Sequence, residues 1–231
     1  MLVGWSPGSS MWPPGPARSV AVSLLLGLMS GTSADGVDAA LLEVEGTPPE
    51  GLRWRLVAHR TTPHPDPLRE RILEATRGGG AEALCALHVE LAETFASAAL
   101  SLLAAAGVDP GSLEAVGSHG QTVWHRPPTA GARGATLQLG DPATLAARLG
   151  VEVISDFRAA DMAAGGHGAP LVPWADRALL ARDDGPRVVL NVGGMANLTW
   201  LPARGSPDTV VAFDTGPGNV LLDHAAALAS G

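Results

Sequence analysis

Apolar positions after residue 20 divide the chain into short, mostly apolar runs and longer segments with helical spacing. Short apolar runs predict strands, and apolar residues three or four positions apart predict helices. The strands are expected at residues 24–29, 37–45, 54–62, 113–120, 136–140 and 151–157, and the helices at 66–77, 81–106 and 141–150. Three strands, then helices, then a strand–helix–strand segment are typical of an α/β domain.

The pattern restarts after a glycine-rich linker at residues 163–170. A helix is predicted at residues 172–182, and strands within 188–202 and 210–219 precede an apolar helix that begins at Val220. Two strands around a Gly-Gly turn repeat the first half, where the turn SGTSADG joins two strands as a hairpin.

We therefore expect two similar α/β domains. The expected division is a flexible extension rich in Pro, Gly and Ser at residues 1–20, a first domain at 21–160, and the start of a second domain at 161–231. The second domain is expected to be incomplete, because no closing element follows its last helix.

Charge and composition narrow the possible chemistry. The 231 residues carry 15 basic and 23 acidic side chains, for a net charge of −8, and every basic residue is Arg. An acidic balance disfavours general nucleic-acid binding, which needs clustered cations. The absence of Lys excludes a P-loop lysine and a Schiff-base lysine. The single Cys85 excludes an internal disulfide, and its apolar helical surroundings predict a buried thiol.

Two features bear on location. The apolar stretch after Arg18 looks like a secretion signal, but the acidic loop that follows it favours a retained segment. No apolar run approaches the roughly 18–20 residues of a membrane span. We therefore expect a cytoplasmic protein that does not bind a membrane or nucleic acid.

The turn SGTSADGVD at residues 30–38 has the composition of an anion site. Glycines let backbone N–H groups approach a phosphate, and hydroxyls add donors. Asp35 and Asp38 suit a hydrated Mg²⁺ ion, which prefers one or two carboxylates. The segment NVGGMAN at 191–197 repeats the arrangement in the second half, as a nucleotide held between two similar domains would require. A plain hairpin turn with solvated acids is the alternative.

Asp214 stands in FDTGPGN at a predicted strand end, before a glycine-rich turn. A carboxylate there can accept a proton from an attacking hydroxyl or water. A helix-capping role is one alternative. An aspartic protease is another, although that enzyme class needs two such triplets and this chain has one.

Two further segments carry polar side chains suited to a sugar. His119, Gln121 and His125 lie in GSHGQTVWHRP at 117–127, where their spacing disfavours zinc and favours hydrogen bonds to hydroxyl groups. Arg158 and Asp161 lie in SDFRAAD at 155–161, where Arg suits a carboxylate. A loop whose histidines bond to local backbone, and an internal Arg–Asp ion pair, remain open as alternatives.

Taken together, six segments resemble the anhydro-N-acetylmuramic acid kinases of bacterial cell-wall recycling. They are GLMSGTSADGVDAAL, GSHGQTVWHRP, LQLGDP, ISDFRAADMAAGGHGAPLVP, LNVGGMANLT and FDTGPGNVLLD, in the order of the family, and they cover residues 24 to about 224. The resemblance implies an actin-like (ribonuclease H-like) two-domain sugar-kinase fold with ATP and Mg²⁺ in the cleft. It also implies hydrolytic opening of a 1,6-anhydro bond coupled to phosphorylation of O6.

The resemblance also implies roles for individual residues. The phosphate-binding loop would comprise Gly31, Thr32, Ser33, Ala34, Asp35, Gly36, Val37 and Asp38, with Asp35 and Asp38 near the metal. Gly193 and Gly194 would line the other side of the nucleotide, and Asp214 would be the general base that activates water. His119, Gln121, Arg158 and Asp161 would face the sugar, with Arg158 on the lactyl carboxylate.

Three departures from the family pattern stand out. Residues 1–20 are extra, His167 replaces a Gln that is common in GGQGAP, and family members continue beyond the equivalent of Gly231. The resemblance implies a homodimer and an anhydrosugar as the small-molecule partner. A non-catalytic nucleotide- or sugar-binding fragment of the same fold is the alternative function.

Overall fold

The computed structural model describes residues 22–47, 51–193 and 195–230. Contacts between Cα atoms divide the chain into two compact units. The described residues of the large unit are 22–45 and 54–169, and those of the small unit are 46–47, 51–53, 170–193 and 195–230. The extension expected at residues 1–20 lies outside the described residues. The division at residue 170 lies nine positions beyond the expected domain boundary.

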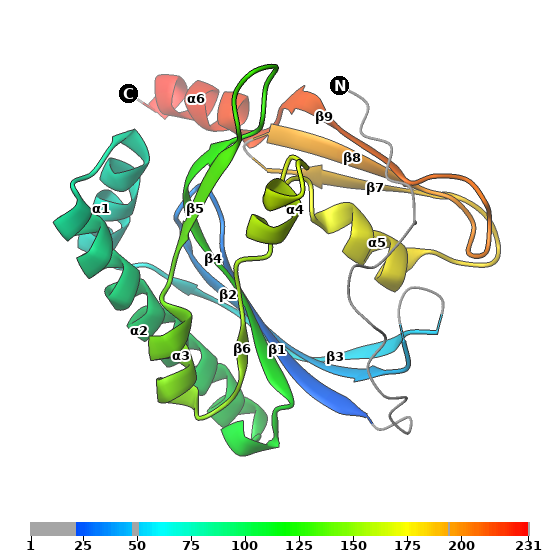
Figure 1. Cartoon of the computed structure of the whole chain (residues 1–231), viewed down its shortest axis with the longest axis horizontal. Coiled ribbons are helices and arrows are strands. Elements are labelled where there is room, and N and C mark those ends of the chain that lie inside the picture. The colour runs from blue at the N-terminus through cyan, green and yellow to red at the C-terminus, as the bar shows by residue number, and fades with distance from the viewer. Residues whose placement is uncertain (1–21, 48–50, 194, 231) are drawn as a thin grey trace. The chain divides into compact units, whose positions relative to one another are not determined.

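A mixed sheet forms the centre of the large unit (Figure 1). Its strands run in the order β3-β2-β1-β4-β5, and β6 also pairs with β4. Their bounds are β1 (Ser23–Ser30), β2 (Gly36–Glu45), β3 (Arg53–Pro63), β4 (Ala115–Arg126), β5 (Ala135–Leu139) and β6 (Val153–Ile154). Strand β1 pairs antiparallel with β2 and parallel with β4. This sheet and its helices confirm the α/β fold class.

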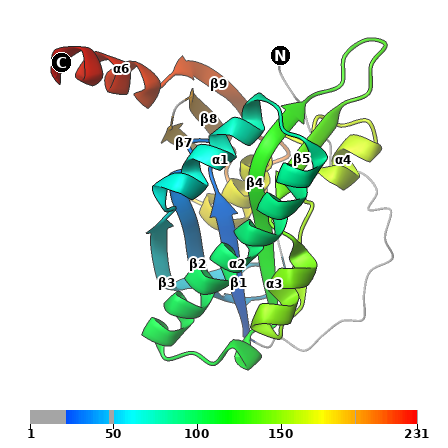
Figure 2. The ribbon, with the colours of Figure 1, turned by 90° about the vertical axis from the view of Figure 1, so that its left-hand side faces the viewer.

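Helices cover one face of this sheet (Figures 1 and 2). They are α1 (Asp66–Arg77), α2 (Ala81–Ala106) and α3 (Pro142–Leu149), and the short elements η1 (Pro110–Ser112) and α4 (Ala159–Ala163) complete the unit. Alternation along β2 turns Val37, Ala39 and Leu41 toward the helices, where each is at most 1% exposed. Phe95 of α2 is fully buried in the same core.

Helix α2 corrects two expectations. By length and composition α2 could cross a membrane. It is the one such helix in the described part of the chain. Nine of its residues are nevertheless buried, and they pack against the sheet and neighbouring helices as a core helix does. Cys85 is exposed on its N-terminal part, so the expectation of a buried thiol is wrong. Leu84 faces the core there instead.

A three-stranded antiparallel sheet, β7-β8-β9, forms the centre of the small unit. The bounds are β7 (Arg187–Val192), β8 (Met195–Leu201) and β9 (Val211–Pro217), with α5 (Val172–Leu180) and α6 (Asn219–Ser230). Helix α5 contacts β8, where Thr199 and Leu201 are buried. On the alternate positions of β7, Val188, Leu190 and Val192 are 50–59% exposed.

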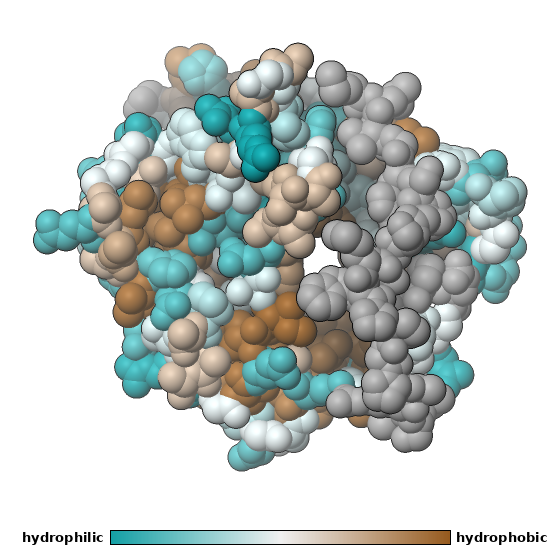
Figure 3. Space-filling model, viewed as in Figure 1, coloured by the Kyte–Doolittle hydropathy of each residue, from teal (hydrophilic) through white to brown (hydrophobic). Residues whose placement is uncertain are grey.

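Local elements depart from the prediction where distant pairing decides the structure. Strand β4 continues to Arg126 through residues expected to form a loop, because β5 pairs with it. Strand β6 has only two residues, and α4 was not expected. Asp141 caps α3 by accepting from two amides, whereas Pro65 stands at the N-cap of α1 and no side chain caps that helix. The face in Figure 3 shows patches of hydrophobic residues between hydrophilic ones.

Candidate functional site

The turn between β1 and β2 is tight and partly strained. Ala34 is fully buried with φ +53°, a left-handed conformation that costs a non-glycine residue about 1–2 kcal/mol. Its N–H donates to the Gly31 carbonyl at 3.0 Å. A Cβ at Gly36 would lie 2.3 Å from the Thr62 carbonyl oxygen, so only glycine fits there. Strained loops of this kind cluster at ligand sites.

The tip of this turn consists of exposed residues whose amides make no main-chain hydrogen bond in the described structure. Thr32 and Ser33 are both exposed. Within the described residues, no main-chain hydrogen bond engages the amides of Thr32 and Ser33. Exposed N–H groups in a turn form a concavity that suits an anion. The role of this turn in phosphate binding stays a prediction.

The two acids of the turn have different partners. Asp35 lies 3.7 Å from the Arg69 guanidinium of α1. Asp38 lies within β2, accepts from the Thr61 hydroxyl, and lies 3.7 Å from His59 on β3. Both side chains are more than half exposed, which fits a hydrated Mg²⁺ ion. Among the described residues no group of three or more metal-ligating side chains is present, so their role as ligands stays a prediction.

Gln121 lies under this turn and not beside His119. Its side chain is fully buried, its Oε1 accepts from Ser30 Oγ at 2.5 Å, and its Nε2 donates to Gly31 O at 3.0 Å. A shift in strand register is the cause, because Leu28 pairs with Ser118 whereas Ser30 pairs with Gln121. Gly120, with φ +73°, provides the extra residue. The expected role of Gln121 toward the sugar stays a prediction.

A second cluster joins β4 to the segment after β6. The Arg158 guanidinium donates from Nε and Nη2 to His119 Nε2, at 3.1 and 2.9 Å. His119 is therefore neutral, with its proton on Nδ1, which donates to Gly120 O at 3.0 Å. Burial lowers the pKa of His119, and the nearby positive charge of Arg158 lowers it further. Burial also lowers the pKa of Arg158.

Arg158 and Asp161 both hold the main chain of Gly168. The Arg158 Nη1 group donates to Gly168 O, and the Asp161 carboxylate accepts from Gly168 N, both at 2.7 Å. Asp156, just before them, has φ +56°. The two positive-φ non-glycine residues found in the described structure therefore lie in the two predicted ligand segments. In place of the internal Arg–Asp ion pair that was the alternative, both side chains bond to the main chain of Gly168.

A hollow of about 490 Å³ opens beside the second cluster. Its lining includes Arg133, Thr136, Ala159 and Met162. Thr136 is hydrogen-bonded to His125 Nδ1 at 3.1 Å, and the His125 Nε2 atom is buried without a partner among the described residues. Burial lowers the pKa of His125, with smaller contributions from Arg158 and His167. A neutral ring with an unused nitrogen suits a sugar hydroxyl.

Asp214 lies within β9, three residues before its end, and is exposed. Strand register places it opposite Asn197, which in turn lies opposite Asn191. The three polar residues therefore form a row across one face of the small sheet. The glycine-rich turn lies nearby in the same unit, where Gly193 O accepts from the Asn219 amide at 2.8 Å. Gly194 lies outside the described residues.

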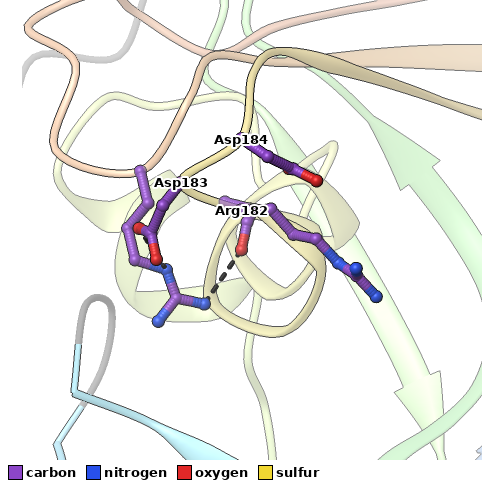
Figure 4. Close-up of a pocket in the computed structure, with 5 residues that line it drawn as sticks. Arg182, Asp183 and Asp184 are labelled. Atoms are coloured by element: carbon purple, nitrogen blue, oxygen red, sulfur yellow. Dashed lines mark hydrogen bonds and ion pairs between the residues drawn. The ribbon is translucent and has the colours of Figure 1, made fainter.

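A second hollow, of about 330 Å³, lies in the small unit and is lined by charged residues of two connections (Figure 4). Arg204 Nη2 donates to Ala181 O at 2.9 Å, and its Nε lies 4.0 Å from Asp183. Asp184 lies 3.4 Å from Arg187.

Comparison with known proteins identifies the family. The model of the family described as anhydro-N-acetylmuramic acid kinase matches residues 23–231. The chain belongs to this family. It is 50% identical over 209 residues to the anhydro-N-acetylmuramic acid kinase of Salinibacter ruber, covering 88% of this chain and 52% of that protein. The kinase of Gloeobacter violaceus is 46% identical over 211 residues, covering 90% and 55%.

The chain spans about half the length of the curated relatives that it matches. Among solved structures, YeaZ from Pseudomonas aeruginosa matches 85% of this chain and 68% of its own, at 15% identity and a TM-score of 0.25. That likeness is too weak to support any inference. The matched residues of the family model include both predicted ligand segments and Asp214.

Proposed function

We propose that the chain carries the phosphate-binding and sugar-binding machinery of an ATP-dependent kinase. The kinase hydrolyses the 1,6-anhydro bond of 1,6-anhydro-N-acetylmuramic acid, phosphorylates O6, and yields N-acetylmuramate 6-phosphate for cell-wall recycling. The observation that carries this proposal is the family match over residues 23–231. A cytoplasmic location and a homodimer belong to the same proposal.

The phosphates of the nucleotide are assigned to the turn at residues 31–38. The exposed amides of Thr32 and Ser33 and the close fit at Gly36 support this assignment. When bound, ATP supplies the phosphoryl group, and Mg²⁺ neutralises the charge on the phosphates. Asp35 and Asp38 would hold the hydrated metal, and Gly193 and Gly194 would line the nucleotide.

The sugar is assigned to the cluster around Arg158. The Arg158 guanidinium is half-buried and has the neutral His119 beside it, which favours a carboxylate such as the lactyl group. Asp161 would hold the neighbouring loop through Gly168. Gln121, which the resemblance also places on the sugar side, is fully buried, and its contacts support a role under the phosphate turn.

Asp214 is assigned as the general base. Its carboxylate would take a proton from water as the water oxygen bonds to C1 of the sugar, and the C1–O6 bond would break. The released O6 would then bond to the γ-phosphorus, and ADP would leave with the electron pair of the broken P–O bond. The exposed position of Asp214, opposite Asn197, supports access for water.

Mass spectrometry of the product tests this proposal. The chain is incubated with ATP, Mg²⁺ and 1,6-anhydro-N-acetylmuramate in ¹⁸O-water, with the full-length Salinibacter ruber relative as a positive control. We expect a phosphorylated sugar that carries one heavy oxygen. Asp214→Asn should lower the rate about 10²–10⁴-fold, because that is the usual contribution of a general base. The matched control Asp208→Asn changes an exposed acid between β8 and β9 and should retain the rate.

The outcomes separate the two candidate functions. Binding of Mg–ATP and sugar without turnover would favour the non-catalytic binding module. Phosphorylation of another sugar, but not of this one, would support the proposed kinase activity and contradict the proposed substrate. An active Asp214→Asn variant would remove that residue from the mechanism.

A further inference from the structure

Three buried polar side chains from three different elements meet under the turn at residues 31–38. Ser30 ends β1, Gln121 lies on β4, and His64 follows β3 (Figure 1). They are respectively 1%, 0% and 5% exposed. Burying polar groups is costly unless they are hydrogen-bonded. A plain hairpin turn needs no such support, so the cluster requires its own explanation.

The hydrogen bonds form a chain with one consistent direction. Gln121 Nε2 donates to Gly31 O at 3.0 Å, which leaves Gln121 Oε1 as the acceptor from Ser30 Oγ. The Ser30 hydroxyl has one proton and uses it on Gln121. It must therefore accept from His64 Nε2, at 3.1 Å. The opposite orientation of the Gln121 amide would place two oxygens against each other at Gly31.

His64 must carry a proton on Nε2 for this chain to form. Its Nε2 carries the proton, and its buried Nδ1 has no partner among the described residues. Protonation of Nδ1 would add a second buried N–H donor without an acceptor, which is unfavourable. Burial lowers the pKa of His64, while the charge of Asp35 raises it by less. The hydrogen bond to Ser30 therefore selects the Nε2–H tautomer, and burial favours the neutral form.

The hydrogen-bond chain holds the strained part of the turn. Gly31 O accepts from both Gln121 Nε2 and the Ala34 amide, and Ala34 has the positive φ. The His64 amide donates to Asp35 O at 3.0 Å and holds the far side of the turn. A strained backbone persists only where its surroundings hold it in place. These contacts hold both ends of the turn and leave the amides of its tip exposed.

We propose that Ser30, His64 and Gln121 are positioning residues of the nucleotide site, which hold the turn at residues 31–38 in its phosphate-binding shape through a buried hydrogen-bond chain. This inference rests on the proposed function, because it assumes that the turn binds phosphates. His64 carries no motif and was not predicted from the sequence. Its assignment comes from the bonds to Ser30 and Asp35 alone.

A matched pair of substitutions at His64 tests the proposal on the 231-residue chain. His64→Gln keeps an N–H donor near the place of Nε2, whereas His64→Leu removes it at similar size. His224→Gln, on the exposed helix α6, is the control. Equilibrium dialysis measures the affinity for Mg–ATP, hydrogen exchange follows the amides of residues 31–35 and of α2, and ¹⁵N spectra give the tautomer of His64 at pH 7.

We expect the Nε2–H tautomer in the unmodified chain. His64→Leu should weaken Mg–ATP binding at least tenfold and speed exchange of the hydrogen-bonded Ala34 amide at least tenfold, with exchange in α2 unchanged. His64→Gln should stay within threefold on both measurements. If His64→Leu unfolds the chain, the tautomer of His64 and the His64→Gln result still decide whether the proposal holds.

Three results would overturn the proposal. They are an Nδ1–H tautomer of His64, equal effects of Leu and Gln, or faster exchange in the turn with unchanged Mg–ATP affinity. If the unmodified chain and the full-length relative both fail to bind Mg–ATP, the proposed function falls and the positioning role falls with it. In that case the tautomer and exchange data would still report whether the hydrogen-bond chain exists.

Discussion

The two units contain the same local arrangement with different surroundings. In the large unit, β1, β2 and β3 form an antiparallel meander whose first turn is glycine-rich, and α1 follows. In the small unit, β7, β8 and β9 form a second meander with a glycine-rich first turn, and α6 follows. The repetition that the sequence predicts is therefore present in the structure.

Burial separates the two meanders. Leu41 of β2 is fully buried beneath the helices of the large unit. Leu190 of β7 is 59% exposed although it lies in a strand of the same kind, and every described residue of α6 is exposed. The comparison teaches that an apolar strand pattern specifies the strand, while its stabilisation depends on what packs against it.

The largest loss of stability is expected from a substitution in the buried meander of the large unit. Leu41→Ala should lower the free energy of unfolding by about 2–5 kcal/mol, because it removes a fully buried side chain and leaves a cavity. Denaturant unfolding gives the change, and hydrogen exchange in β1, β2 and α2 should show where the loss occurs. A loss below about 1 kcal/mol would mean that this meander is no better packed than the other.

An intermediate loss of stability is expected at the glycine that each meander requires. A Cβ at Gly36 would lie 2.3 Å from Thr62 O, and one at Gly218 would lie 2.3 Å from Gly193 O. Alanine at either position should cost about 1–3 kcal/mol, because main-chain atoms must move. Hydrogen exchange of the unit that carries each substitution measures the loss of stability.

Gly27→Ala is the matched control for these two variants. Gly27 lies within β1, and the nearest atom to its added Cβ is 3.9 Å away, so no loss is expected. A large loss at Gly36 with none at Gly218 would show that only the large unit holds its glycine-rich turn against a second segment.

The sequence predicts those elements whose cause is local. The helix at 81–106 has the predicted bounds, and β1, β2 and β3 differ from the predicted strands by at most two residues at either end. Strand β4 was predicted too short, because residues 121–126 become a strand only through pairing with β5. Helix α4 has only five residues, which are too few to show a periodic pattern.

The candidate site follows the same rule. The turn at 31–38 and the contact of Arg158 with His119 lie in segments that the sequence singles out. The position of Gln121 depends on a one-residue shift in register, which no local pattern specifies. His64 has no signal at all, because its importance comes from contacts with residues far along the chain.

The smallest effect is expected in the exposed meander, and it is the most direct test of the comparison. Leu190→Ala makes the same chemical change as Leu41→Ala, on a side chain that is 59% exposed, so the free energy of unfolding should change by less than about 0.5 kcal/mol. The same denaturation experiment measures it. A loss of about 2 kcal/mol that shrinks on dilution would show that copies of the chain bury this face in solution. A loss independent of concentration would instead place other residues of the same chain over β7, and the contrast between the units would disappear.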